Sequence, residues 1–292
     1  MGSQARWAMV GAALVSLLLP LAVEQPHANA SPRVAVGPAV RTVQALPVTT
    51  VRRTAAPSCP AGLVALTFDD GPARGLTVRL VQSLERLHVP ATFFMVGSRI
   101  RTAPYAARVV ARAGFMVGNH TWSHSHLTRL SDSSVRSEIR RTAAILRRQR
   151  VPKSPLMRPP YGDINPRVRA DVHRLGLVPV LWDVDSNDWR GGSTAVIAAS
   201  ILAQLRPHES NIVLQHDGVR NSPASVAAVP RVVRTARQRG YCFTTLGPDG
   251  RMVPLEPATD GGDGAGPAAT TGLRARPSFD VSRLPGDPVS GA

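Results

Sequence analysis

The chain has 292 residues, 43% of them hydrophobic, which is enough apolar material for a full core and excludes a globally disordered protein. Its formal net charge is +16, and arginine supplies nearly all of the basic residues, because Lys153 is the single lysine. This excess favours an anionic partner: a nucleic acid, an acidic lipid surface or an anionic cell-wall polymer. The length allows one or two domains.

Residues 1–30 have the composition of a secretory signal peptide. Arg6 precedes an apolar run over 7–23, and the small residues of Ala28-Asn29-Ala30 follow, as at a cleavage site. The run is shorter than the roughly 20 residues that span a bilayer. We therefore predict cleavage and secretion; the alternative is an uncleaved segment that holds the protein at the membrane.

Two further segments have the composition of unstructured chain. Residues 31–57 are rich in Pro, Val, Thr and Ala without a clear period, and residues 251–292 are rich in Gly, Pro and Asp. We predict a disordered linker over 31–57 and a disordered tail over 251–292. We expect residues 58–250 to form one folded domain, which also carries most of the excess positive charge.

Within residues 58–250, apolar runs of strand length alternate with amphipathic stretches of helix length. The predicted strands cover 63–68, 91–96, 115–118, 156–158, 177–182, 211–215 and 241–245. The predicted helices cover 77–87, 104–113, 131–149, 165–176, 193–205 and 225–239, with Ser131 and Asn165 as N-caps of two of them. The alternation predicts an α/β fold, a parallel (β/α) barrel of about seven strands, with an open doubly wound sheet as the alternative.

Reactive side chains follow five of the predicted strands, at the point where each strand ends. In chain order they are Asp69 and Asp70; His120 and His124; Arg158; Asp183, Asp185 and Asp188; and His216 with Asp217. Parallel α/β folds build their sites at the carboxyl ends of the strands. The sequence therefore predicts a single site that combines carboxylates, imidazoles and one guanidinium.

His120 and His124 form an H-x-x-x-H pair, and on a helical turn their two rings share a face. Two imidazoles and one carboxylate make a three-ligand zinc site with an open position. Either Asp69 or Asp70 can supply the carboxylate, and the other can take a proton from a water activated by the metal. The residues alone leave open which aspartate has which role.

Two more strand-end residues suit the same chemistry. His216 is a natural acid for the leaving group, and Arg158 can keep one aspartate ionised and oriented. Each motif alone has an ordinary structural explanation, since Asp-Asp-Gly-Pro is usually a turn. Their joint placement on successive strand ends favours a catalytic site, with His126 as a spare histidine beside it.

Five motifs in this order resemble those of the polysaccharide deacetylases, carbohydrate esterase family 4, also called the NodB-homology domain. They are Thr67-Phe68-Asp69-Asp70-Gly71, His120-Thr121-Trp122-Ser123-His124, Arg158-Pro159-Pro160-Tyr161, Asp185-Ser186-Asn187-Asp188-Trp189 and Leu214-Gln215-His216-Asp217. The resemblance spans residues 63–246. It implies a distorted (β/α) barrel and one divalent metal, usually zinc, with cobalt or another divalent ion as alternatives.

The resemblance also assigns the roles that the residues alone leave open. It implies that Asp70, His120 and His124 hold the metal, that Asp69 is the general base, and that His216 is the general acid.

Further roles follow from the same resemblance. Arg158 orients Asp69, and Asp188 tunes His216, while the role of Asp185 stays open.

The substrate side of the site is implied in the same way. The backbone N–H of Tyr161 stabilises the oxyanion, and Tyr161, Trp189 and Leu214 line the pocket for the acetyl methyl group and the sugar face.

Cys59 and Cys242 are the only cysteines; one precedes the first predicted strand and the other lies in the last. The first and last strands are neighbours in a closed barrel, and a secreted chain permits oxidation. We therefore predict a disulfide between them.

The leading functional hypothesis is a secreted, metal-dependent deacetylase that removes the N-acetyl group from N-acetylglucosamine units of a β-1,4 glycan. Peptidoglycan is the first candidate substrate and chitin oligomers the second. The alternative is an O-deacetylase that acts on acetylated xylan. A non-catalytic glycan-binding protein of the cell wall is a third hypothesis, against which the intact Asp69 and His216 argue.

The charge does not indicate nucleic-acid binding. Aromatic residues make up 4% of the chain, and no basic cluster with interleaved aromatics is present. We expect the acetylated polysaccharide as partner, retention near an anionic cell envelope, no nucleic acid, membrane contact only through an uncleaved signal segment, and a monomer.

Overall fold

Parallel strands and α-helices alternate along residues 59–255, the part of the chain that the computed structural model describes. The predicted signal peptide (1–30), the linker (31–57) and the tail beyond 255 lie outside the described residues. The strands are β1 (Gly62–Asp69), β2 (Ala91–Met95), β3 (Met116–Asn119), β4 (Leu156–Met157), β5 (Val178–Pro179), β6 (Val184–Asp185), β7 (Ile212–His216) and β8 (Tyr241–Phe243). The helices are α1 (Arg74–Leu87), α2 (Gly97–Thr102), α3 (Pro104–Arg112), α4 (Asp132–Arg148), α5 (Pro166–Arg174), α6 (Thr194–Gln204) and α7 (Ser222–Gln238).

The strands form one sheet in the order β5-β4-β3-β2-β1-β7-β6, and β8 pairs with the beginning of β1. Every ladder between these strands is parallel. The sheet curls into a half-barrel, and among residues 59–255 no ladder joins its two ends, β5 and β6. The predicted parallel barrel is confirmed in this curled, incomplete form.

The predicted strand over 177–182 is too long: within that range the structure has only β5 (Val178–Pro179), and the short strand β6 follows at Val184–Asp185. The Arg158 side chain explains the break, because it donates to the carbonyls of Val180 at 3.3 Å and Leu181 at 3.0 Å. Those carbonyls are thereby occupied by a side chain instead of a neighbouring strand. Pro179, which has no N–H, also limits the ladder at this point.

The two predicted N-caps are confirmed: the side chain of Ser131 accepts from the N–H of Ser134, and that of Asn165 accepts from the N–H of Val168. Helix α2 was not predicted, because its six residues are too few to show an amphipathic period.

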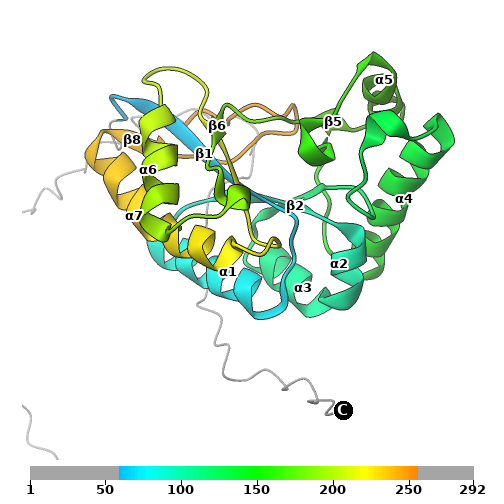
Figure 1. Ribbon diagram of the computed structural model, residues 1–292, viewed down its shortest axis with the longest axis horizontal. Helices are drawn as coiled ribbons and strands as arrows, with labels where there is room; N and C mark the ends of the chain where they lie inside the picture. Colours follow the sequence, from blue (N-terminus) through cyan, green and yellow to red (C-terminus); the bar gives the residue numbers. More distant parts are fainter. Residues whose placement is uncertain (1–58, 256–292) are drawn as a thin grey trace, which may run out of the picture. The chain divides into compact units, whose positions relative to one another are not determined.

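The two faces of β1 belong to different apolar clusters. Val64, Leu66 and Phe68 join the large core beneath α1, α3 and α7, the helices that line one side of the sheet in Figure 1. Ala65 faces the inside of the curl, where it packs with Leu246 among other residues. This alternation with a period of two brings Thr67 and Asp69 to the inner face as well.

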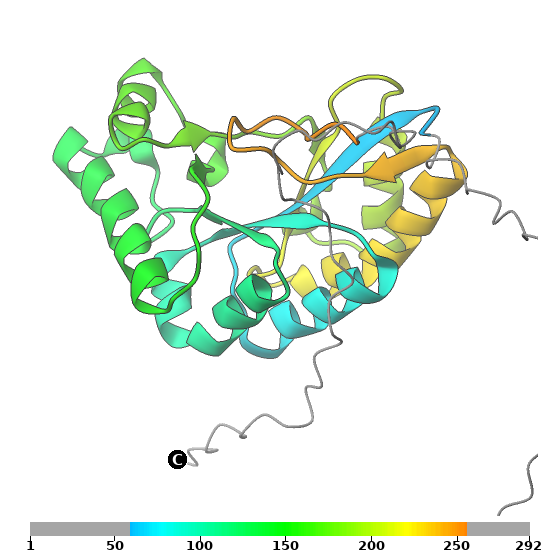
Figure 2. The same ribbon diagram turned by 180° about the vertical axis from the view of Figure 1, so that it is seen from behind.

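The chain beyond β8 also contributes to the inside of the curl. Leu246 bridges to Met252, and the N–H of Val253 donates to the carbonyl of Thr245. This segment runs back over the sheet, in orange in Figure 2. The chain is therefore hydrogen-bonded to the domain through Val253, slightly past the predicted boundary at 250.

Cys59 and Cys242 form the predicted disulfide, with Cα atoms 5.4 Å apart. The pairing of Leu63 with Cys242 in the β1–β8 ladder brings the two cysteines together. Of the helices within residues 59–255, none has the length and apolar character needed to cross a bilayer.

Candidate active site

The predicted site residues meet at the carboxyl end of the curled sheet. The register aligns Asp69 with His216 across β1 and β7, and aligns Asn119 with Met157 across β3 and β4. The residues that follow Asn119 and Met157 are His120 and Arg158, so four strand ends deliver their side chains to one place.

We call the group of Asp70, His120 and His124 the metal cluster. The potential ligand atoms of these three residues all lie within 4.8 Å of one another. The Nε2 atoms of the two rings lie 3.5 Å and 3.0 Å from Oδ1 of Asp70. That oxygen is buried and accepts no hydrogen bond. Burial raises the pKa of Asp70, but the facing His124 and His120 outweigh it and hold the pKa far below its usual range.

The orientation of His120 suits a metal ligand. Its Nδ1 atom lies 2.7 Å from the carbonyl oxygen of Arg158, which can only accept, so Nδ1 carries the proton and Nε2 presents its lone pair to Asp70. Burial also lowers the pKa of His120, which favours the neutral ring. One carboxylate oxygen left without a donor and two converging imidazole nitrogens fit a single divalent ion of the zinc type.

The two imidazoles converge without a helix, which corrects the predicted helical turn. Residues 120–124 form an irregular loop, in which Thr121 and His124 have left-handed backbone conformations with φ of 64° and 60°. The side chain of Asn119 accepts from the N–H of Thr121, and the Thr121 hydroxyl accepts from the N–H of His124. These bonds bring the two ring centroids to 5.0 Å.

Glu138 of α4 also supports this loop and was missed in the sequence. One of its carboxylate oxygens accepts from the N–H groups of Trp122 at 3.0 Å and Ser123 at 2.8 Å. The sequence pattern could have identified Glu138, because it is a glutamate on the buried face of α4, between Val135 and Thr142.

Asp69 is held by the buried guanidinium of Arg158. Nη1 of Arg158 donates to Oδ1 of Asp69 at 2.9 Å and to the hydroxyl of Thr67 at 2.7 Å. The guanidinium also lies over the ring of Phe94, 4.3 Å from its centroid. Burial lowers the pKa of Arg158, an effect that Asp69 opposes. The second oxygen of Asp69 lies 3.7 Å from Nε2 of His120, beside the metal cluster.

His216 forms a tight pair with Asp188. Its Nδ1 atom lies 2.6 Å from one oxygen of Asp188, and its backbone N–H donates to the other at 2.8 Å. Burial alone lowers the pKa of His216, but the hydrogen bond and charge of Asp188, with smaller contributions from Asp69 and Asp70, raise it to about 9. His216 is therefore an imidazolium at neutral pH and can donate a proton.

The three predicted substrate-contacting residues differ in exposure. Tyr161 and Trp189 are 59% and 52% exposed, whereas Leu214 is buried in β7. The ring of Tyr161 lies edge-on to that of His124, with centroids 4.6 Å apart, so Tyr161 borders the metal cluster. Its φ of 61° turns the backbone sharply at this point.

His126 and Asp185 lie outside the metal cluster. The ring of His126 stacks on that of Tyr161, with ring centroids 3.9 Å apart, and its Nδ1 atom lies 3.2 Å from Oδ2 of Asp163. Asp185, whose role was open, accepts from the N–H of Asn187 and thereby shapes the turn that precedes Asp188.

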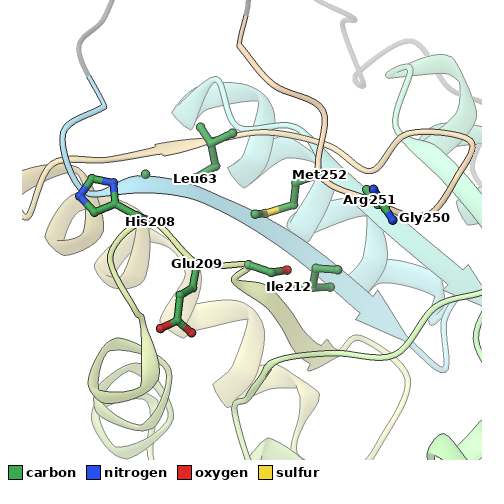
Figure 3. Close-up of a pocket in the computed structure, with 9 residues that line it drawn as sticks. Leu63, His208, Glu209, Ile212, Gly250, Arg251 and Met252 are labelled. Carbon is green, nitrogen blue, oxygen red and sulfur yellow. The ribbon is translucent and has the colours of Figure 1, made fainter.

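A shallow hollow of about 530 Å³ lies at the other end of the sheet (Figure 3). It is lined by the first residues of β1, Gly62 and Leu63, together with Ile212 at the start of β7 and Met252. None of Asp70, His120 and His124 lines it, so this hollow is separate from their cluster at the carboxyl ends of the strands.

Comparison with known proteins identifies a family and several relatives. The family model described as polysaccharide deacetylase matches residues 57–180. A peptidoglycan-N-acetylglucosamine deacetylase of Bacillus cereus is 33% identical over 184 residues, 63% of this chain and 66% of the relative. A bifunctional xylanase/xylan deacetylase of Cellvibrio japonicus is 34% identical over 66% of this chain and 28% of the relative. The chain thus spans less than two thirds of either relative.

One solved structure is matched by this chain over nearly its whole length. A family 4 carbohydrate esterase from Streptomyces lividans, in complex with acetate, is 36% identical with a TM-score of 0.60, over 67% of this chain and 98% of that one. The half-barrel, with its carboxylates and imidazoles at the carboxyl ends of the strands, is thus a fold that this chain shares with a family 4 carbohydrate esterase. The chain belongs to the polysaccharide deacetylase family.

Proposed function

We propose that this protein is a secreted, metal-dependent N-deacetylase that releases acetate from N-acetylglucosamine units of peptidoglycan. The observation that carries the proposal is the juxtaposition of the Asp70-His120-His124 cluster with two further groups, Asp69 and His216. The cluster suits a metal ion, Asp69 suits a base, and His216 suits an acid. A glycan-binding protein without activity has no need of this combination.

Asp70, His120 and His124 would hold the divalent ion, zinc before cobalt, because two imidazoles and one carboxylate form its usual catalytic ligand set. When bound, the ion supplies Lewis-acid stabilisation of charge on oxygen and activation of water.

Asp69 takes the proton from the attacking water as the new C–O bond forms at the acetyl carbonyl carbon. Arg158 holds Asp69 for this task through its 2.9 Å hydrogen bond and its positive charge. The salt bridge occupies Oδ1 and leaves Oδ2, the oxygen nearer His120, to accept the proton.

His216 gives its proton to the amide nitrogen as the C–N bond breaks, and the products are acetate and the free amine. Asp188 keeps His216 protonated and fixes its ring, since Nδ1 is used for Asp188 and Nε2 remains for the substrate. The backbone N–H of Tyr161 would donate to the developing oxyanion, and exposed Tyr161 and Trp189, with Leu214, would line the acetyl pocket.

Peptidoglycan is the preferred substrate because the Bacillus cereus relative is named for it. Xylan deacetylation is the second candidate, supported by the Cellvibrio japonicus relative. The excess of arginine suits an anionic cell envelope, where a secreted deacetylase of peptidoglycan meets its substrate.

Acetate release tests the proposal. Zinc-loaded protein is incubated with N-acetylglucosamine oligomers, peptidoglycan and acetylated xylan, each with and without a chelator. We expect release from the N-acetylated glycans that stops with the chelator and returns when zinc is restored. Release from xylan alone would favour the O-deacetylase, and no release from any substrate would overturn the enzyme assignment.

A further inference from the structure

The end of β2 carries no reactive residue, but it contacts the loops after β1, β3 and β7, which do or which adjoin one that does. Residues 96–99, which follow β2 and which we call the bridging segment, begin at Val96 and end at Arg99. The N–H of Val96 donates to the carbonyl of Gly71 at 2.9 Å, directly after Asp70. The segment is thereby tied to the loop that follows β1.

The next two residues of the bridging segment bind the loop of the two imidazoles. The N–H of Gly97 donates to the carbonyl of Thr121 at 2.9 Å, and the N–H of Ser98 donates to that of Trp122 at 3.0 Å. Gly97 is required there, because a Cβ atom would lie 2.6 Å from the Trp122 ring. The segment therefore sets the position of the backbone between His120 and His124.

Arg99 completes the connection with its side chain. A single nitrogen, Nη1, donates to the carbonyl of Asp70 at 2.5 Å and to that of Gly218 at 2.6 Å. The two carbonyls belong to the loops after β1 and β7; the first loop carries Asp70, and the second directly follows His216. A cation between two carbonyl oxygens offsets their mutual repulsion and makes both hydrogen bonds charge-assisted.

The loops after β1 and β7 are closely packed where Arg99 binds them. A Cβ atom at Gly218 would lie 2.1 Å from the carbonyl oxygen of Asp70 and 2.2 Å from Nη1 of Arg99. Asp70 itself has a φ of 70°, a left-handed conformation that a non-glycine residue adopts only when its surroundings hold it there. The direction of the Asp70 side chain depends on that backbone conformation.

We infer that the bridging segment sets the spacing of the active-site loops, and that Arg99 is a positioning residue for Asp70 and for the loop of His216. Arg99 acts through these two backbone carbonyls. The inference rests on the proposed function for its catalytic consequence, but its effect on the Asp70 cluster is measurable as zinc affinity without any turnover.

The test compares Arg99→Met with the wild type and with Arg86→Met, a control that removes an exposed arginine from α1. Zinc affinity is measured by competition with a chelating indicator, and kcat and KM by acetate release. We expect Arg99→Met to bind zinc at least tenfold more weakly and to lose at least tenfold in kcat, with KM changed less than threefold. Arg99→Lys, which restores a cationic donor, should recover part of the affinity, and Arg86→Met should match the wild type.

Zinc affinity and kcat within twofold of the wild type in a folded Arg99→Met protein would overturn the inference, whatever happens to its melting temperature. If Arg99→Met does not fold, Gly218→Ala decides, since its methyl group separates the same carbonyls; wild-type zinc affinity there would overturn the inference. A wild-type protein that binds no zinc or releases no acetate refutes the proposed function instead.

Discussion

Asp188 holds His216 at two points, with one carboxylate oxygen 2.6 Å from Nδ1 of the ring and the other accepting the backbone N–H at 2.8 Å. The pair thereby fixes both the place of the imidazole and its proton. Burial by itself lowers the pKa of His216, and Asp188 reverses that effect and raises the pKa to about 9.

We expect Asp188→Asn to move the alkaline limit of activity to lower pH. A general acid works in its protonated form, so kcat falls as pH rises through the pKa of His216, near 9 in the wild type. Loss of the Asp188 charge leaves burial as the main influence and lowers that pKa by at least one unit. The pH dependence of kcat between 6 and 10 measures the shift, with Asp249→Asn as an exposed control. An alkaline limit that stays near pH 9 would contradict the role of Asp188.

Substitutions of the two adjacent aspartates, Asp69 and Asp70, should have different effects on zinc affinity and on kcat. Asp69→Asn removes the proton acceptor but leaves the metal cluster intact, so we expect normal zinc affinity and a loss of kcat of about 10²–10⁴-fold. Asp70→Asn replaces the orphan oxygen of the cluster, so zinc affinity should fall first. Zinc titration and acetate release on both variants check this, and the reverse pattern would show that the two roles are exchanged.

Much of this site could be predicted because its residues directly follow strands. The carboxyl ends of parallel strands lie at one edge of the sheet whatever the structure of the loops. Correct prediction of the strand ends was therefore enough to bring Asp69, His120 and His216 together. The N-caps at Ser131 and Asn165 were equally accessible, since capping is a local interaction.

The remainder depends on contacts between segments far apart in the chain. The loop between His120 and His124 takes its shape from Glu138 in α4, which no local pattern around the histidines contains. The early end of β5 within the predicted strand over 177–182 depends on Arg158, some 20 residues earlier in the chain. Arg99 was missed because its partners are backbone carbonyls, which every residue type offers.

Arg158→Met should cost both activity and stability. It leaves the carboxylate of Asp69 buried without its cation, a change that typically costs about 3–5 kcal/mol. Urea unfolding measures the loss. The double variant Arg158→Met/Asp69→Asn removes the unpaired charge as well, so it should regain part of the stability and none of the activity. No difference between the single and double variants would contradict the ion-pair explanation.

The disulfide should contribute to stability without affecting catalysis. It joins residues 183 positions apart, and the chain-entropy model gives about 4–5 kcal/mol as the upper figure for so long a loop. Cys59→Ser/Cys242→Ser should therefore unfold at lower urea concentration, while kcat of the folded protein stays within twofold. The reason is that the bridge lies at the beginning of β1 and Asp69 at its end. A tenfold loss of kcat at low temperature would contradict this separation.

Asp217 should make the metal-free protein less stable as pH rises through the acid range. Its carboxyl group is fully buried against Gly71, and one oxygen has no hydrogen-bond partner. Burial raises its pKa from 3.8 to about 7, although the hydroxyl of Thr77 opposes the rise. The unfolded chain therefore loses this proton at lower pH than the folded protein, so folding free energy is lost between about pH 4 and pH 7.

Asp217→Asn removes this titration while keeping an acceptor for the Thr77 hydroxyl. Relative to the wild type, the variant should gain stability as pH rises from 4 to 7, by up to about 4 kcal/mol, and the difference should then level off. Urea unfolding at pH 4, 5.5, 7 and 8.5 in the presence of a chelator measures the difference. A difference that is constant across these four values would show that Asp217 carries the same charge in the folded and unfolded states.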